Sequence, residues 1–210
     1  VGGFLLFFFT ERNGMTLVKG SVVEKLANTF FMSVTPRTAG YYSVDYFQMS
    51  HAGLILTMFL MYIGGTSGST AGGLKTTTLG VLFIQMHAMF KGKTRAEAFG
   101  RTIRQATVLR ALTLFFVTLL LCMVAIMILS VTETIPKNSG IEYIAFEVFS
   151  AFGTVGLTMG LTPDLSFIGK LVIISLMYIG RVGIMTVVFS LLVKAHKAEA
   201  KYKFPEESMM

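Results

Sequence analysis

Two short segments of the chain carry residues suited to binding a cation through main-chain carbonyl groups. Each contains a Thr-x-Gly sequence, and the two sequences lie 116 residues apart. Glycine adopts backbone angles that other residues resist, so the carbonyls beside it can turn toward a common axis. A ring of such carbonyls can replace the hydration shell of an ion, and two loops would supply half of a fourfold ring. The candidate ion-binding residues are Thr38, Ala39, Gly40, Tyr41, Thr154, Val155, Gly156 and Leu157.

The residues before each Thr-x-Gly sequence predict a short helix. Both stretches open with S-x-x-E, Ser21 to Glu24 and Ser139 to Glu142, the capping-box pattern in which serine and glutamate satisfy free N–H groups. About 13 helical residues then span roughly 20 Å, which is less than a hydrocarbon core of about 30 Å. The C-terminal end of such a half helix carries partial negative charge and favours a cation. One Thr-x-Gly sequence alone is typical of a simple turn, but the matched pair favours a filter.

The similarity between the two segments continues beyond the turns. Gly53 and Gly169 keep the offset of 116, as do the runs 61–64 and 177–180. The predicted unit is a spanning helix, a half helix, a Thr-x-Gly turn and a second spanning helix. Residues 1–9 are expected to be the last turns of a leading helix, so the chain is expected to be a fragment.

A glycine-rich segment interrupts the long apolar stretch 52–90. Non-helical backbone cannot face lipid, so we expect this segment to be buried in protein or to line water, within a broken helix. An ordinary loop between two short membrane helices is the alternative. A phosphate-binding P-loop is excluded because Lys75 does not directly follow the last glycine. The segment consists of Gly64, Gly65, Thr66, Ser67, Gly68, Ser69, Thr70, Ala71, Gly72 and Gly73.

The composition indicates a membrane protein. Of 210 residues, 53% are hydrophobic and 14% are charged, which excludes a typical soluble enzyme domain. Residues 111–131 and 171–193 are predicted to span the membrane. Arg181 lies near the middle of the second span, where it either faces a polar cavity or pairs with a buried acid or snorkels. With one cysteine and three dispersed histidines, we expect no resident metal and no cofactor.

Basic residues predict the orientation. They cluster in 91–110 and in the tail from Lys194, so both segments are expected to be cytoplasmic, with 132–164 outside. The basic connector either binds anionic lipid headgroups or an acidic partner, or is simply solvated. No nucleic-acid partner is expected.

Four motifs and the tail resemble one family. The motifs are TPRTAGY (35–41), GGTSGSTAGGLKTTT (64–78), AFGTVGL (151–157) and MYIGRVG (177–183), and the tail sequence is KYKFPEE (201–207). Together they resemble the Trk/Ktr/HKT superfamily of potassium transporters, and the tail is similar to that of the Ktr membrane subunit.

The resemblance implies an all-α membrane protein with tandem helix–pore loop–helix repeats, two of an expected four, around a pseudo-fourfold ion pore. Residues 1–90 would be the third repeat, 91–108 a cytoplasmic connector, 109–193 the fourth repeat and 194–210 a cytoplasmic tail. The glycine-rich segment 64–73 would be an intramembrane gate beneath the filter, and Arg181 a pore-facing arginine.

The implied function is K⁺ uptake across the cell membrane by a multi-pass protein that is not an enzyme, with dependence on Na⁺ left open. The implied partners are a second copy of the full-length subunit, a cytosolic nucleotide-binding regulatory ring, and membrane lipid. Within the same class, a Trk-type subunit is the alternative. The rivals from another class are a non-conducting membrane scaffold and an intramembrane enzyme, which would need acid, histidine or serine side chains clustered at one depth.

Overall fold

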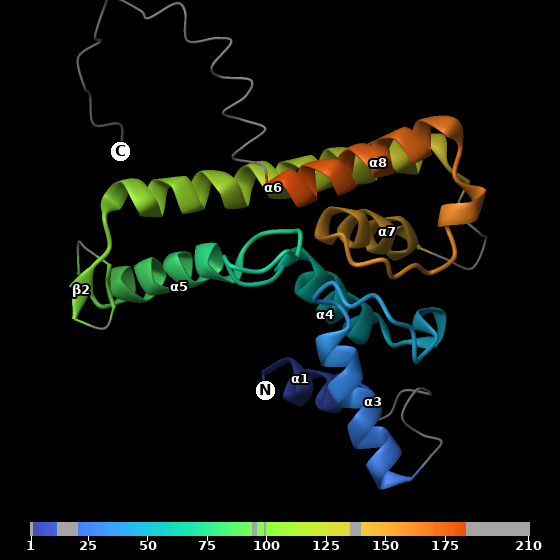
Figure 1. Cartoon of the computed structure of the whole chain (residues 1–210), viewed down its shortest axis with the longest axis horizontal. Helices are drawn as coiled ribbons and strands as arrows, with labels where there is room; N and C mark the ends of the chain where they lie inside the picture. The colour runs from blue at the N-terminus through green and yellow to red at the C-terminus, as the bar shows by residue number, and fades with distance from the viewer. Residues whose placement is uncertain (1, 12–20, 94–95, 99, 135–139, 184–210) are drawn as a thin grey trace, which may run out of the picture.

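The apolar segments of the chain form α-helices, which satisfy their main-chain polar groups internally. The computed structural model describes residues 2–11, 21–93, 96–98, 100–134 and 140–183 (Figure 1). Short 3₁₀ turns lie at Tyr46–Gln48 and Thr162–Asp164. The helices of the described residues are α1 (Gly2–Thr10), α3 (Val22–Val34), α4 (His51–Tyr62), α5 (Thr76–Phe90), α6 (Gln105–Thr132), α7 (Ile141–Gly153) and α8 (Phe167–Val182).

The predicted spans lie within helices where the structure describes them, although both helices begin several residues before the predicted span. Segment 111–131 lies within α6, which, among the described residues, is the one helix long and apolar enough to cross a membrane by length and composition. Helix α8 covers the first part of the span 171–193, and residues 184–193 lie outside the described residues. The interruption of the apolar stretch is confirmed, because α4 ends at Tyr62 and α5 begins at Thr76. Both the broken helix and the ordinary loop between two short helices fit these helix ends.

The two half-length helices are α3 and α7, each 13 residues long. The first capping box is confirmed, since the Ser21 N–H donates to Glu24 Oε2 at 2.9 Å. The second is not, because the N-cap residue of α7 is Gly140. Ser139 itself lies outside the described residues.

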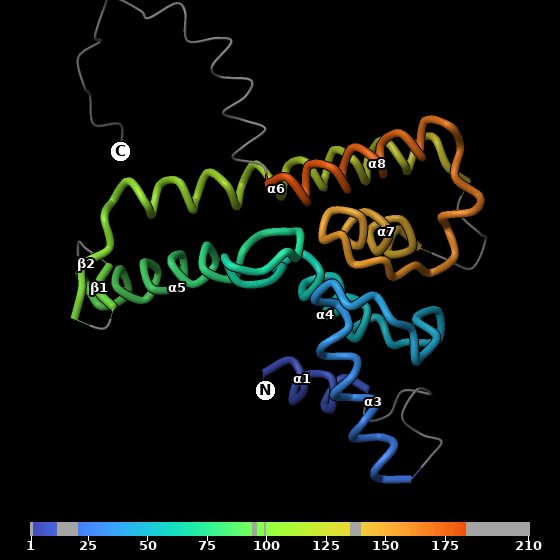
Figure 2. The backbone as a smooth tube through the Cα atoms, in the orientation of Figure 1, coloured from blue at the N-terminus to red at the C-terminus, as the bar shows by residue number. Residues whose placement is uncertain are grey.

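A small hairpin adds strand structure that the all-α prediction did not include. Strands β1 (Glu97–Ala98) and β2 (Arg101–Thr102) pair antiparallel within the connector. Gly100, at a φ of +74°, allows the tight reversal between them. Figure 2 shows the hairpin at the far end of the α5 and α6 pair, away from α7.

Helix α7 is the central helix of the fold. In Figures 1 and 2 it lies between α8 and α4, and it also contacts α6. Its residues enter both hydrophobic clusters: Ile144 and Phe152 pack with α6 and α8, and Phe146 packs with α1, α3 and α4. Tyr62, at the end of α4, links α4 to α6, because its hydroxyl is 2.7 Å from Thr118 Oγ1 on α6.

A carboxylate clamp fastens the start of α4 and of α8 to the preceding part of the chain. Ser50 caps α4, and its N–H donates to Glu11 Oε1 at 3.2 Å, as does its hydroxyl. Ser166 caps α8, and its N–H and hydroxyl donate to the two Glu133 oxygens at 2.9 and 2.5 Å. One carboxylate lies directly against the start of each helix. Its negative charge also interacts favourably with the partial positive charge at the helix N-terminus.

The clamp explains a matched glycine pair of the sequence. A Cβ at Gly53 would lie 2.2 Å from Glu11 Oε1, and a Cβ at Gly169 would lie 2.3 Å from Glu133 Oε1. A larger residue at either position would have to displace the glutamate from the helix start. The acids themselves do not share the offset of 116, so the sequence comparison missed them, although Ser50 and Ser166 share it.

Replacing Glu133 by glutamine is expected to lower the melting temperature at pH 7. It should also make the melting temperature depend less on pH in the acidic range. Burial raises the pKa of Glu133, but hydrogen bonds from Ser166 and Thr132, together with the charge of Lys170, lower it below its ordinary value overall. A carboxyl whose folded-state pKa is depressed contributes stability above its unfolded pKa, and this is lost as pH falls through the folded value. The melting temperature of the wild-type full-length protein should therefore fall below about pH 4.5. That of Glu133→Gln should fall less steeply over the same range.

The measurement is thermal unfolding in detergent across pH 3 to 7. Glu97→Gln is the matched control. The pKa of Glu97 is also lowered, by a hydrogen bond and the charge of Lys93, but this surface pair contributes little to stability. Equal melting temperatures of Glu133→Gln and wild type at pH 7 would show that the clamp does not stabilise the fold.

Candidate functional site

The two Thr-x-Gly sequences adopt the same unusual backbone conformation. Thr38 and Thr154 have φ values of +68° and +51°, and Gly40 and Gly156 have φ values of +69° and +91°. A positive φ is a marked outlier for a β-branched residue and occurs where the surroundings hold it. The offset of 116 found in the sequence therefore matches a shared backbone geometry.

The two loops lie in direct backbone contact. A Cβ placed on Gly40 would lie 2.2 Å from the carbonyl oxygen of Val155. The side chains of Val155 and Leu157 are buried in the same hydrophobic cluster as Phe146. Gly156 is exposed and would meet nothing within 4 Å. The second loop is therefore anchored through apolar side chains while its glycine stays accessible.

The first loop is held differently. The Thr35 hydroxyl donates to the carbonyl oxygen of Tyr41 at 2.7 Å, which closes the turn across the Thr-x-Gly sequence. The Gly40 N–H donates to the Thr35 carbonyl at 3.3 Å. Ala39 and the side chain of Tyr41 are exposed. The structure thus brings together the backbones of the two loops, while the side chain of Tyr41 points away from the core.

The glycine-rich segment 64–73 packs against the second loop. A Cβ on Gly72 would lie 2.6 Å from Thr154 Oγ1 and 2.9 Å from the Gly153 carbonyl oxygen. Thr154 Oγ1 is buried and has no hydrogen-bond partner among the described residues. Residues 66–70 are exposed, whereas Ala71 and Gly72 are buried. One end of the segment therefore touches the candidate ion site and the middle of it does not.

The two ends of this segment are fastened to one another. The Gly64 N–H donates to the Leu74 carbonyl at 2.8 Å, and the Leu74 N–H donates to the Tyr62 carbonyl at 3.0 Å. A Cβ on Gly64 would lie 1.8 Å from the Gly72 carbonyl oxygen, so only glycine fits. The segment is therefore a closed loop in which backbone packs on backbone.

Lys75 is a further contact of the loop that the sequence analysis did not assign. Its Nζ donates to the carbonyl oxygens of Ser69 and Ala71 at 3.1 and 2.6 Å. A charge-assisted hydrogen bond is stronger than a neutral one, so the lysine holds the exposed part of the loop to the start of α5. The only signal in the sequence was a lysine two positions after the last glycine.

Arg181 lines the same cavity as one end of the loop. The cavity has a volume of about 210 Å³, and Gly73, Lys75 and Thr78 also line it. Within the described part of the chain, no carboxylate lies within 4.0 Å of the guanidinium. A Cβ on Gly180 would lie 2.0 Å from the Phe152 carbonyl oxygen, so α8 packs tightly on the end of α7. Gly73, at the end of the predicted gate, and Arg181 therefore line one cavity together with Phe152 near the end of α7.

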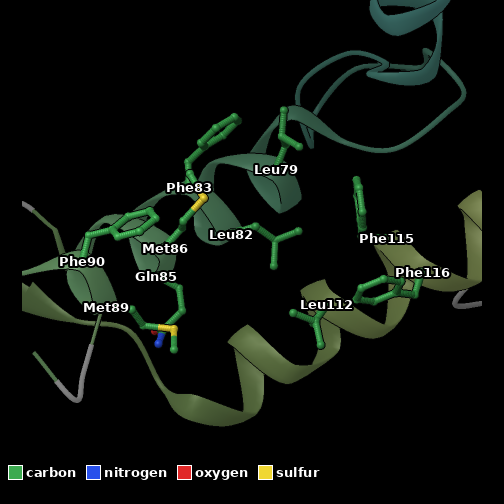
Figure 3. Close-up of a pocket in the computed structure, with 10 residues that line it drawn as sticks. All are labelled: Leu79, Leu82, Phe83, Gln85, Met86, Met89, Phe90, Leu112, Phe115 and Phe116. Carbon is green, nitrogen blue, oxygen red and sulfur yellow. The ribbon is translucent and has the colours of Figure 1, made fainter. Parts of the chain in front are cut away.

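A larger groove lies between α5 and α6 and does not have the chemistry of an ion site. It has a volume of about 640 Å³, and Figure 3 shows mainly leucine, methionine and phenylalanine side chains around it. Such walls offer no replacement for the hydration shell of a cation. Among the described residues, no cluster of three or more His, Cys, Asp or Glu side chains could hold a metal ion.

Known proteins resemble the chain over nearly its whole length. The Enterococcus hirae potassium/sodium uptake protein NtpJ is 88% identical over 210 residues, which are all of this chain and 47% of that protein. The Bacillus subtilis Ktr system potassium uptake protein B is 41% identical over 201 residues, or 96% of this chain and 44% of that protein. The chain spans about half the length of these curated relatives.

A solved structure and a family model also match cation transport proteins. The structure of the potassium transporter TrkH from Vibrio parahaemolyticus superposes with a TM-score of 0.75 at 23% identity, covering 90% of this chain and 41% of that one, and it shows a shared helical fold. The family model described as TrkH, a cation transport protein, matches residues 3–201. The chain is therefore a membrane protein that belongs to the TrkH family of cation transport proteins.

Proposed function

We propose that the full-length protein takes up K⁺ across the cell membrane through a selectivity filter that includes the two Thr-x-Gly loops, 38–41 and 154–157. The observation that carries the proposal is the pair of loops with matched positive φ values, packed backbone to backbone at Gly40 and Val155. Helices α3 and α7 end at these loops, and their C-terminal dipoles favour a cation. Two relatives are named as a potassium/sodium uptake protein and a potassium uptake protein, which supports the choice of ion. The protein acts in this proposal as a transporter and not as an enzyme.

A comparison of equivalent faces of α4 and α8 supports a ring of four repeats. On α4, Met61 and Tyr62 are 0% and 5% exposed because α7, from the following repeat, covers them. At the offset of 116, Met177 and Tyr178 on α8 are 45% and 66% exposed. The exposed face of α8 fits a further repeat supplied by the rest of the protein. Residues 1–90 and 109–193 are then the third and fourth repeats of four around a pseudo-fourfold pore.

The loop 64–73 is the gate in this proposal. It packs under Thr154, so an ion that leaves the filter on that side meets the loop. Lys75 holds the loop in this position. Arg181 borders the cavity at the end of the loop and adds positive charge there.

Replacing Arg181 by alanine is expected to increase the initial rate of ion uptake severalfold. A cation about 10 Å away would feel roughly 1–2 kcal/mol of repulsion at an effective dielectric constant near 20. Removing the charge lowers this electrostatic barrier, whereas Arg181→Lys keeps it and serves as the control. Initial rates of ⁸⁶Rb⁺ uptake by the full-length protein measure the effect. If uptake affinity, rate and gating are all unaltered in Arg181→Ala, the arginine is not a barrier.

The assembly and orientation belong to the same proposal. The connector 91–108 and the tail 194–210 face the cytoplasm, where their basic residues meet an acidic lipid surface or a nucleotide-binding regulatory ring. Two copies of the full-length subunit form a homodimer. The B. subtilis relative is named as protein B of a Ktr system, which supports the proposal of a partner subunit. The apolar outer face of α6 contacts lipid.

The test is ⁸⁶Rb⁺ uptake by the full-length protein in proteoliposomes, in competition with K⁺ and with Na⁺. We expect K⁺ to inhibit uptake at far lower concentrations than Na⁺. The same assay with and without Na⁺ outside shows whether Na⁺ is required, a question raised by the potassium/sodium uptake named for the E. hirae relative. Absence of uptake in both conditions would contradict the proposal and favour a non-conducting scaffold.

A further inference from the structure

A buried carboxylate lies behind the second Thr-x-Gly loop. Glu147 is in the middle of α7, and it is 5% exposed. The Thr158 hydroxyl donates to its Oε2 at 2.8 Å, and the Thr162 hydroxyl donates to its Oε1. Within the described ranges, no basic side chain lies within 4.0 Å of this carboxylate. Because a buried polar group without partners is strongly disfavoured, the acid and the two hydroxyls are held together.

The two hydroxyls belong to the segment that leaves the second loop. Only Leu157, whose side chain is buried, lies between Gly156 and Thr158. The Thr158 hydroxyl oxygen also accepts the Gly160 N–H at 2.9 Å, which fixes the turn that follows. Two residues of extended chain span at most about 7 Å. A shift of Thr158 is therefore transmitted directly to the carbonyls of Gly156 and Leu157.

The first loop has a different anchor at the same place. Counted from the paired serines Ser21 and Ser139, Thr29 is at the helix position equivalent to Glu147. The Thr29 hydroxyl donates to the Lys25 carbonyl within its own helix. Tyr46 stands where the second loop has Thr162, and its ring packs on Phe146 with centroids 5.2 Å apart. Phe146 and Glu147 are neighbours in α7. This helix thus anchors the outward segments of both loops, the first through an aromatic contact and the second through a carboxylate.

We propose that Glu147 is a positioning residue for ion selectivity, which it sets by holding Thr158 and Thr162 and through them the carbonyls of the second loop. The inference rests on the proposed function, because it affects transport only if residues 154–157 contact the ion. Hydrogen bonds to a fixed carboxylate define both distance and direction, whereas an aromatic contact is less directional. Discrimination between K⁺ and Na⁺ depends on how carbonyls are placed and held around the ion. The segment that follows the second loop is thereby fixed to α7 by hydrogen bonds, whereas the segment that follows the first loop contacts α7 through an aromatic ring.

The test compares the concentrations of K⁺ and Na⁺ that halve ⁸⁶Rb⁺ uptake by full-length variants in proteoliposomes. Glu147→Gln keeps the side-chain volume and removes the charge, and Thr158→Val removes one donor. We define the K⁺/Na⁺ selectivity ratio as the half-inhibiting Na⁺ concentration divided by the half-inhibiting K⁺ concentration. We expect each variant to lower this K⁺/Na⁺ ratio about five- to tenfold. The double variant should lose little more than the larger single one, because both changes break one network.

Two controls separate positioning from general stability. Glu142→Gln alters another acid of α7, which is partly exposed and 3.7 Å from His51, and should keep the wild-type ratio. Thr158→Ser keeps the hydroxyl and should also keep the ratio. If Thr158→Ser lowers the ratio as much as Thr158→Val, the hydrogen bond is not the cause and the inference is wrong.

The outcomes also separate this inference from the proposed function. Lower melting temperatures of Glu147→Gln and Thr158→Val with an unaltered K⁺/Na⁺ ratio would assign Glu147 a purely structural role. Gly156→Asp changes the loop itself; if it too leaves the ratio unaltered, the filter assignment is wrong. If Gly156→Asp lowers the ratio and the Glu147 variant does not, only the positioning role is wrong. Should Glu147→Gln not fold, the Thr158→Val and Thr158→Ser pair decides the question.

Discussion

Replacing Gly40 by alanine is expected to abolish selective K⁺ uptake by the full-length protein. The new Cβ would lie 2.2 Å from the Val155 carbonyl oxygen, a backbone atom that cannot rotate away. Alanine is also disfavoured by about 1–2 kcal/mol at the φ of +69° that Gly40 adopts. One methyl group would therefore displace both loops, including a carbonyl proposed to contact the ion. Competition of K⁺ and Na⁺ with ⁸⁶Rb⁺ uptake measures the loss.

Gly156→Ala is the matched control for this result. Gly156 has a φ of +91°, but a Cβ there meets nothing within 4 Å. This variant tests the conformational cost alone, and we expect a milder loss of uptake with part of the K⁺ preference retained. A wild-type K⁺/Na⁺ ratio in Gly40→Ala would show that the two loops do not act as one filter.

Replacing Gly72 by alanine is expected to open the gate. The added Cβ would lie 2.6 Å from Thr154 Oγ1 and 2.9 Å from the Gly153 carbonyl oxygen, so the loop 64–73 must move away from the second Thr-x-Gly loop. If the loop obstructs the ion path, its displacement should raise the initial rate of ⁸⁶Rb⁺ uptake several times. The K⁺/Na⁺ ratio should change little, because the filter backbone is not altered.

Gly68→Ala is the control within the same loop. Gly68 is exposed, and a Cβ there meets nothing within 4 Å. We expect uptake at the wild-type rate. An unaltered rate in Gly72→Ala as well, with folded protein at normal levels, would mean that the loop does not control flow.

The sequence predicted the features that depend on local interactions. The capping residues Ser21 and Glu24 identified the start of α3, and the glycine-rich run identified the break between α4 and α5. The offset between Thr38 and Thr154 predicted two equivalent turns, and their backbone angles agree. These features were readable because helix propensity, capping and turn formation involve residues a few positions apart.

The predictions that failed did so where a local pattern was incomplete. Ser139 matches Ser21 in the sequence, but α7 begins one residue later, with Gly140 at its cap. The β-hairpin at 97–102 is too short for a periodic apolar pattern, and only Gly100 marked the turn. The assignments of filter and gate remain proposals that the variants above would test.

The sequence by itself determined that the chain lies in a membrane, where α3 begins, where the break between α4 and α5 lies, and that two segments repeat. The tertiary structure decided which distant groups meet: Gly40 with Val155, Gly72 with Thr154, Lys75 with the loop carbonyls, and Glu147 with Thr158 and Thr162. It also revealed the clamps of Glu11 and Glu133. The physical reason is that capping and helix formation act between close neighbours in the chain. Packing of backbone on backbone, and hydrogen bonds from distant serine and threonine groups to the carboxylates, form only when the helices are in place.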